Sequence, residues 1–475
     1  MSERLSYKVH PFVGSPQARG NVSRDQRYIN MLFERIPNDV LKEHVVYCTK
    51  RPGLSTFSQP SGVSTGRGIY GWAATSTLYS VFGNVIYRGT ASTSQMNTSS
   101  GRVSFLEIPA YTGNQVLMIT DGQDDYIYTS SHVSTLVDQG TATNYPISSV
   151  PGLFYIDGFV VRGQTNNNYL RNTRENTVSS YDATAFLAVG SHAGALESVH
   201  MQKDQIIAFT KNRIEFFFNN GNPVGSPLLR IDQNTIEMGL ASRESLAWSG
   251  ETAIFVSENS ADGGGGRSVY KIQSLGKVSE IGTPVINKFL DAEGLSISSC
   301  TSWMERVSGQ VIYCLNLAVC SRSFVYMEQT NLWDEWLSVG DLKFNGVAAT
   351  SLNGTVYIQD ASNGSISVLS PVSYQDNNSS FNVYIITSRE NYGTDKFKIA
   401  HELSIIGDKT DGNLVVSAAS DNDGSSFPVL GNIDMSLPQK MLKRLGGFYE
   451  RSYFFQYAGN SSFRVQAYAT RIGMK

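Results

Sequence analysis

Cysteine is scarce in this sequence. The chain of 475 residues contains only Cys48, Cys300, Cys314 and Cys320, too few for a disulfide framework. No Cys-x-x-Cys spacing occurs, so a zinc site is not expected. Cys314 and Cys320 have an even offset on the apolar run Val311–Cys320, and they would share a face if that run were one strand. We expect a protein that is made and folded in a reducing cytoplasm.

Charged residues are also few, at 17% of the chain against about 25% in typical soluble domains. The net charge of −3 gives the whole chain no strong signature of nucleic-acid binding. Residues 1–75 nevertheless contain ten basic and five acidic side chains, and residues 439–475 contain seven basic and one acidic. Two interpretations stay open: the basic ends are solvated or dock on acidic neighbours, or they contact phosphates directly.

Long apolar segments are missing. No run of 18 apolar residues exists, so the sequence predicts no membrane span. The first ten residues, Met1–His10, lack the apolar region of a signal peptide, and we therefore expect none.

The sequence also lacks a recognisable catalytic or metal-binding pattern. No His-x-His or His-Glu-x-x-His set occurs, and we predict no catalytic, cofactor-binding or metal-binding residues and no cofactor. A dyad assembled from distant parts of the chain stays possible. The six histidines are His10, His44, His132, His192, His200 and His401.

Three motifs resemble functional loops but lack the required context. Gly62–Gly66 fits the Gly-x-Ser-x-Gly nucleophile elbow, which needs a helix behind it, whereas a strand is expected here. Asp262–Gly266 is rich in glycine, but a strand rather than a phosphate-binding helix follows it. Asp421–Gly424 begins like a calcium loop, yet Ser426 and Asn432 occupy the positions of the required glycine and glutamate. We interpret all three as loops or hairpin tips.

Trp333-Asp334-Glu335-Trp336 places two carboxylates between two tryptophans, and glycosidases use a pair of carboxylates. Adjacent residues of a strand point to opposite faces, so Asp334 and Glu335 cannot act together as a catalytic pair. We expect the tryptophans to be buried anchors between blades.

A recurring unit is the strongest positive feature. A short aliphatic and aromatic strand runs into a tight polar or glycine turn, and a second strand follows, as in Thr77–Phe82, Gly83-Asn84 and Val85–Tyr87. The steps between turns vary from about 35 to 60 residues, the size of a four-stranded propeller blade. The number of blades stays open, because one blade can hold two hairpins. Turns of this kind start at Gly83, Asp121, Asp157, Lys203, Ser249, Ser308 and Asn353.

These patterns predict an all-β protein in three parts. Residues 1–65 are expected to form an N-terminal strap or docking segment, in which Val45–Cys48 is a strand that ends before a turn at Arg51-Pro52-Gly53. Residues 66–370 are expected to form a β-propeller-like body, and residues 371–475 a C-terminal antiparallel β-sandwich-like domain. One helix is expected from Pro284 to Leu290, with Thr283 as its N-cap.

Several segments together resemble the tail hub, or nozzle, proteins of short-tailed bacteriophages, also called packaged-DNA stabilisation proteins or tail accessory factors. Each segment is short, and the resemblance rests on their order along most of the chain. The segments are Tyr28–Leu32 with Glu34 and Pro37, Arg51–Leu54, Gly66–Tyr70, Leu78–Val81 with Gly83-Asn84 and Tyr87-Arg88, Gly276–Ile281 with Lys288–Leu290, Ser420–Phe427, Lys443–Gly446 and Phe463–Val465.

The resemblance implies a structural virion protein with no enzymatic activity and no catalytic residue to transfer. It implies a homo-hexameric ring below the head-to-tail adaptor or portal. Such a ring would continue the channel for double-stranded DNA, help retain the packaged genome, and dock tail fibres or spikes and a needle or plug. It implies a location in the phage tail, after assembly in the host cytoplasm.

Two alternatives are kept. One is a carbohydrate-binding or glycan-cleaving propeller, which would bring Trp333 and Trp336 within reach of a sugar at the propeller mouth. The other is a monomeric cytoplasmic interaction propeller unrelated to virions.

Overall fold

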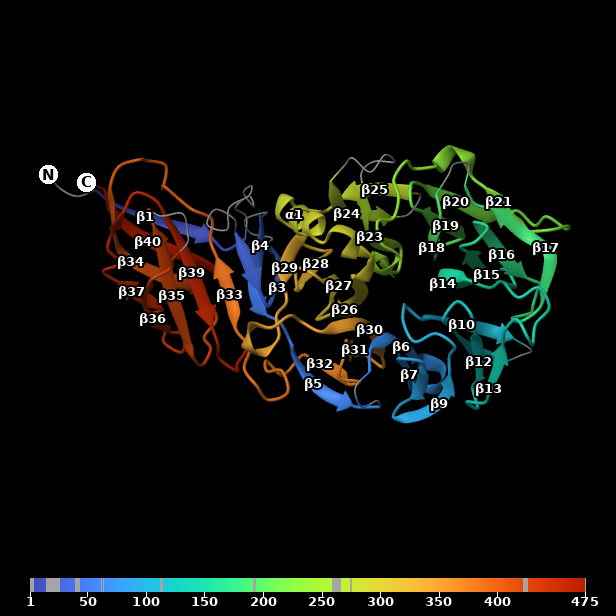
Figure 1. Cartoon of the computed structure of the whole chain (residues 1–475). Coiled ribbons are helices and arrows are strands. Elements are labelled where there is room, and N and C mark those ends of the chain that lie inside the picture. Colours follow the sequence, from blue (N-terminus) through green and yellow to red (C-terminus); the bar gives the residue numbers. More distant parts are fainter. Residues whose placement is uncertain are drawn as a thin grey trace.

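Seven units, each an antiparallel meander, surround a common axis in the computed structural model. The model describes residues 4–13, 26–38, 43–60, 62, 64–111, 114–190, 194–258, 266–273, 276–421 and 426–474. Six of the units are separate four-stranded sheets, the blades of a β-propeller (Figure 1). The remaining unit has the same strand order but continues into a larger sheet.

The first three units follow one another along the chain. The first contains β6 (Gly66–Trp72), β7 (Thr77–Phe82), β8 (Val85–Arg88) and β9 (Ala91–Gln95). The second contains β10 (Ser104–Tyr111), β11 (Asn114–Thr120), β12 (Asp125–Thr129) and β13 (Ser134–Val137). The third contains β14 (Ser149–Ile156), β15 (Phe159–Gln164), β16 (Tyr169–Thr173) and β17 (Tyr181–Ala188).

The next three units complete most of the ring. The fourth contains β18 (Leu196–Gln202), β19 (Gln205–Thr210), β20 (Ile214–Asn219) and β21 (Leu228–Arg230). The fifth contains β22 (Ala247–Ser249), β23 (Thr252–Glu258), β24 (Arg267–Gln273) and β25 (Lys277–Glu280). The sixth contains β26 (Thr301–Val307), β27 (Gln310–Leu317), β28 (Arg322–Met327) and β29 (Leu332–Glu335).

The seventh unit closes the ring with a strand from the N-terminal part of the chain. Its strands are β30 (Gly346–Leu352), β31 (Thr355–Asp360), β32 (Ile366–Ser370) and β5 (Gly53–Ser58), and β5 pairs antiparallel with β32. The backbone N–H of Gly71 in the first unit donates to Thr350 Oγ1 of the seventh at 3.0 Å. Each of the seven predicted turns falls in a different unit, which confirms the repeat and the propeller fold.

A two-sheet sandwich follows the propeller. One sheet contains β1 (Arg4–Pro11), β3 (Met31–Asn38), β4 (Glu43–Lys50), β34 (Lys398–Gly407), β37 (Met441–Lys443), β38 (Gly447–Phe448) and β40 (Arg464–Met474). The second contains β2 (Arg27–Ile29), β33 (Val383–Ile386), β39 (Arg451–Tyr457), β35 (Asn413–Ser420) and β36 (Val429–Asp434). β1 and β40 lie side by side at the end of the molecule away from the propeller (Figure 1).

The sixth unit joins the propeller to the sandwich. Strand β2 pairs with β29 on one side and with β33 on the other, so a nine-stranded sheet runs from one part into the other. A single apolar core contains Trp303 and Trp336 from the propeller side and Phe455 and Tyr468 from the sandwich. Strands from the expected strap, residues 1–65, therefore lie within the sheets of both the propeller and the sandwich. The domain boundaries at 65/66 and 370/371 stay a prediction.

The helix α1 (Pro284–Ala292) begins where the sequence predicts. Thr283 has an extended backbone, and its hydroxyl accepts from the backbone N–H of Ile286 at 3.4 Å. Ile286 and Leu290 are buried on one face, against the fifth and sixth units. The 3-10 segments that lie wholly within the described residues are η1 (Ala73–Thr75), η2 (Asp232–Asn234), η3 (Arg243–Ser245), η5 (Gly294–Ser299) and η6 (Val339–Asp341).

The cysteines do not share the predicted strand. β27 ends at Leu317, and Cys320 lies in the turn before β28, so the run Val311–Cys320 is not one strand. The turn is held by Glu293, whose carboxylate accepts from the backbone N–H groups of Val319 at 3.0 Å and Cys320 at 2.6 Å. All four cysteines are free thiols.

Candidate functional site

A cavity of about 540 Å³ opens at the mouth of the propeller. Residues at or near the beginnings of β6, β10, β22, β26 and β30, together with Gly152 and Leu153 of β14, line it. Residues of its rim such as Ser99, Ser100 and Ser299 are exposed to solvent. This position, on the axis where first strands from most units meet, is the usual place for a site in a toroidal fold.

Arg67 shapes one side of the mouth. Its guanidinium has five N–H donors, and all five are used within hydrogen-bond distance. Nε donates to Gly101 O at 2.7 Å, and Nη1 donates to Gly83 O at 2.8 Å and Thr98 O at 2.7 Å. Nη2 donates to Thr98 Oγ1 at 2.7 Å and to Ser100 O at 2.8 Å. Arg67 therefore holds the loop between β9 and β10, together with Asp121 and Asp124, which accept from the backbone N–H groups of Thr98 and Asn97, both at 3.0 Å.

Arg102, at the end of that loop, reaches across the axis. Its Nη1 donates to Leu246 O at 2.6 Å in the fifth unit, and its Nη2 donates to Ser302 O at 3.4 Å in the sixth. Its backbone N–H donates to Glu244 Oε1 at 3.3 Å. Arg102 thus connects the start of the second unit to the fifth and sixth units of the ring.

Aromatic rings and carboxylates also face the mouth. Tyr70 and Phe105 stack with ring centroids 5.6 Å apart and an interplanar angle of 10°. Trp248 is 39% exposed and packs against the imidazole of His200, with ring centroids 4.6 Å apart. Glu305 accepts from the Ser351 hydroxyl, and burial raises the pKa of its carboxyl. The site offers apolar faces and hydrogen-bonding groups.

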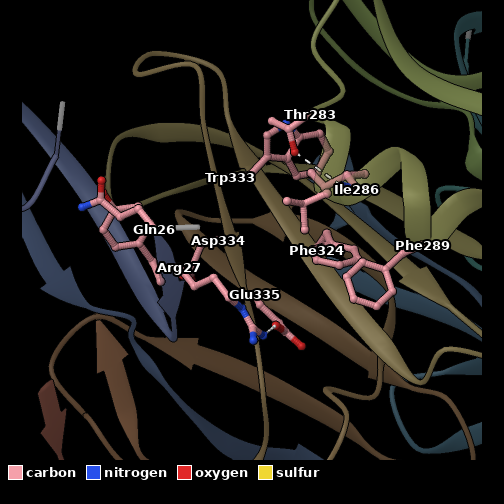
Figure 2. A pocket seen from close by; sticks show the side chains of 11 residues that line it. Gln26, Arg27, Thr283, Ile286, Phe289, Phe324, Trp333, Asp334 and Glu335 are labelled. Atoms are coloured by element: carbon pink, nitrogen blue, oxygen red, sulfur yellow. Dashed lines mark hydrogen bonds and ion pairs between the residues drawn. The ribbon is translucent and has the colours of Figure 1, made fainter. Parts of the chain in front are cut away.

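A smaller pocket of about 50 Å³ lies between α1 and the strands β2 and β29. Figure 2 shows Phe289 of α1 beside Phe324, and their ring centroids are 5.5 Å apart. Arg27 Nη2 is 2.8 Å from Glu335 Oε2 at the edge of this pocket, and Arg322 pairs with the other oxygen of Glu335. The ion pairs connect β2, β28 and β29, which gives this pocket a role in joining the propeller to the sandwich.

The Trp333–Trp336 segment is interior, as the sequence predicts. Trp333 and Trp336 are buried, and Trp333 Nε1 donates to Ile281 O at 2.7 Å. Asp334 accepts from the backbone N–H of Met31 at 2.8 Å, whereas Glu335 binds Arg27 and Arg322. Neither tryptophan lines the cavity at the mouth, which is against the alternative that places both within reach of a sugar there.

The histidines whose side chains the structure describes do not form a site together. His10 Nδ1 lies 3.2 Å from Glu390 Oε1, and His10 Nε2 lies 3.3 Å from Thr470 Oγ1. This order of groups resembles a catalytic triad, but Thr470 is fully buried and cannot attack a substrate. His192 lies outside the described residues, as does the side chain of His44.

Where the structure describes the three loop motifs, their neighbouring elements are those that the sequence predicts. Gly66 begins strand β6 and not a helix. Asp421 accepts from the backbone N–H groups of Tyr449 and Glu450, both at 2.7 Å, while 422–424 lie outside the described residues. Within Asp262–Gly266, only Gly266 is described. No three His, Cys, Asp or Glu side chains in the described ranges are arranged to hold a metal ion.

Sequence reasoning gave no role to Arg67, Arg102 or Trp248. Arg67 lies in the segment Gly66–Tyr70, where an arginine between two glycines is the one available signal. No local sequence pattern distinguishes Arg102 or Trp248, because the residues that they contact are more than 40 positions away in the sequence.

Among the described helices, none has the length and hydrophobicity required to cross a membrane.

Solved structures similar to the chain share little of its sequence. The N-terminal domain of Nup159 is 12% identical with a TM-score of 0.40, over 72% of this chain and 97% of that domain. Virginiamycin B lyase from Staphylococcus aureus is 11% identical with a TM-score of 0.42, over 66% and 98%.

An exo-β-1,3-galactanase from Phanerochaete chrysosporium is 11% identical with a TM-score of 0.30, over 78% of this chain and 95% of the enzyme. Similarities this weak carry no argument about activity. None of the curated proteins matches the sequence.

A protein family is recognised in the sequence itself. The family model described as "Bacteriophage P22 Gp10, beta-propeller" matches residues 16–374, a range that contains every strand of the seven units. The match agrees with the observed fold and confirms the resemblance to phage tail proteins. The chain belongs to the bacteriophage P22 Gp10 β-propeller family.

Proposed function

We propose that the chain is the hub, or nozzle, of the tail of a short-tailed bacteriophage, where six copies form a ring below the head-to-tail adaptor. The observation that carries this proposal is the family match over 16–374, which makes the chain a phage structural protein. In the proposal the ring continues the DNA channel, helps to retain the packaged genome, and has no enzymatic activity.

The dimensions of the single chain favour a conduit made by several copies. The axial cavity of the propeller holds about 540 Å³, equivalent to a cube with sides of about 8 Å, and Arg102 crosses it. The major groove of B-DNA alone is about 12 Å wide. A duplex therefore does not fit through one propeller, and the proposed channel lies on the axis of the ring.

The joint between propeller and sandwich supports a structural role. A continuous sheet, one apolar core and the ion pairs of Glu335 connect the two parts. Because no linker separates the two parts, such a protein can pass force from one neighbouring protein of the tail to the next without bending. We propose that the outer surfaces dock the adaptor or portal, tail fibres or spikes, and the needle or plug, within a virion tail assembled in the host cytoplasm.

The test is the mass of the purified chain by light scattering, alone and mixed with the adaptor complex. A mass near six times the 52.1 kDa of one chain, alone or on the adaptor, would support the hub. A monomer that does not bind the adaptor would exclude it. Electron microscopy of the larger species would show whether the copies form a closed ring.

A further inference from the structure

We propose that the cavity at the mouth of the propeller binds a neutral oligosaccharide. Such a site goes beyond the structural role proposed above and does not depend on the ring. It also differs from the sugar site expected from Trp333 and Trp336, because other side chains form it.

The charges of the lining balance one another. Its charged residues are Arg67 and Arg102 on one side and Glu244 and Glu305 on the other. Arg67 uses all five of its donors on the protein, and Arg102 donates to two carbonyl groups. An anionic or cationic ligand would find no excess of opposite charge to offset its desolvation, whereas an uncharged polar ligand needs only hydrogen-bond partners.

Hydroxyl groups dominate the polar part of the wall. The serines come from two segments that meet at the mouth, 99–104 and 298–302, and four of them are exposed to solvent. Serine hydroxyls can donate to and accept from the hydroxyl groups of a sugar, whereas the carboxylates of Glu244 and Glu305 accept from them. The serines concerned are Ser99, Ser100, Ser104, Ser298, Ser299 and Ser302.

Two aromatic surfaces complement these polar groups. Trp248 is 39% exposed, although His200 packs against its ring and Arg102 Cζ lies 5.7 Å from the ring centroid, so a part of the indole is left for a ligand. The stacked pair Tyr70 and Phe105 forms another wall. A sugar ring combines an apolar C–H face with a polar edge, and a cavity with aromatic faces and few convergent polar groups suits that combination.

The cavity is also preformed and of suitable size. Arg67 fixes the rim, so little ordering is required on binding. A volume of about 540 Å³ is within the range of about 300–1,000 Å³ for small-ligand sites. An extended peptide is less suited, because Arg102 already occupies the carbonyls of Leu246 and Ser302, which would otherwise bond to a peptide backbone.

Trp248 provides a direct readout. The other four tryptophans, Trp72, Trp303, Trp333 and Trp336, are at most 5% exposed, so acrylamide should quench Trp248 selectively. The full chain would be screened on a glycan array, and each hit would be titrated while acrylamide quenching is measured. We expect a bound glycan to protect Trp248 and the variants Trp248→Ala and Glu305→Gln to bind at least tenfold more weakly.

The matched control is Phe57→Ala, which removes an exposed aromatic side chain outside the cavity and should leave affinity unchanged. Circular dichroism would verify that each variant is folded. The proposal is overturned if no neutral glycan binds. It is equally overturned if a glycan binds without protecting Trp248 and with full affinity for both variants, or if only charged glycans or peptides bind.

Discussion

Arg51 and Asp376 form a buried, bidentate ion pair where the last unit of the propeller closes. Nη1 lies 3.0 Å from Oδ1 and Nη2 lies 2.6 Å from Oδ2, although 325 residues separate the two positions. The remaining donors of Arg51 reach Asn30 Oδ1, Pro52 O and Leu337 O. One guanidinium thus connects the start of β5 with the segments that follow β29 and β32.

Arg51→Ala should therefore destabilise the protein strongly. The substitution leaves the Asp376 carboxylate buried without its cation, and breaking such a pair costs about 3–5 kcal/mol. The free energy of unfolding, measured by urea denaturation, should fall by about that amount.

The control is Arg174→Ala, which removes a surface pair with Asp182. Both side chains are largely exposed, at 60% and 45%, so solvent screens the pair and the loss should be much smaller than for Arg51→Ala. Equal losses in the two variants would show that Arg51 does not have the role assigned to it.

Arg67→Ala should loosen the loop before β10. All five hydrogen bonds that the guanidinium donates would be lost, four of them to Thr98, Ser100 and Gly101. Local opening then becomes easier, and backbone amides in 97–103 should exchange with deuterium at least tenfold faster. Arg88→Ala, a change in the same unit that leaves these bonds intact, should not alter their exchange. Unchanged exchange in Arg67→Ala would mean that the loop is held by other contacts.

Thr283→Ala should shorten or destabilise α1. The Thr283 hydroxyl accepts from the N–H of Ile286, and loss of such a cap typically costs about 1 kcal/mol. Thr283→Ser retains a hydroxyl and should lose less than half as much. Urea denaturation of the three proteins tests this order. If serine is as damaging as alanine, the hydroxyl does not act as a cap.

Local chemistry explains why the repeats and α1 could be predicted. A turn such as Asn353-Gly354 requires positive φ at both residues, here 50° and 78°, and glycine and asparagine tolerate that conformation best. Thr283 and Pro284 similarly favour the first turn of a helix from their own chemistry. Signals of this type need no knowledge of the rest of the chain.

Long-range pairing explains what the sequence did not reveal. β5 pairs with β32 more than 300 residues later, and β2 lies between β29 and β33. An alternating pattern identifies a strand but not its partner, so the sequence predicts a strap for residues 1–65, whereas their strands lie inside three sheets. The mouth cavity was missed for the same reason, since its wall combines short segments of distant units.

His200 should make stability depend on pH. It is buried on β18 beside Trp248, and no described group lies within hydrogen-bond distance of Nε2. Burial lowers the pKa of His200 from 6.5 to about 4. Between these values the unfolded chain binds a proton that the folded chain does not, so stability falls as the pH decreases from 6.5 towards 4.

The comparison of the original chain with His200→Gln isolates this effect, because the other titrating groups are common to both. At pH 5, which is 1.5 units below the pKa of 6.5 in the unfolded chain, protonation of His200 stabilises the unfolded chain by about 2 kcal/mol. Between pH 7 and pH 5, the original chain should lose about 2 kcal/mol more stability than the variant in urea denaturation. Equal losses would mean that His200 is protonated in the folded protein, and the packing of its ring against Trp248 would then have to tolerate a charge.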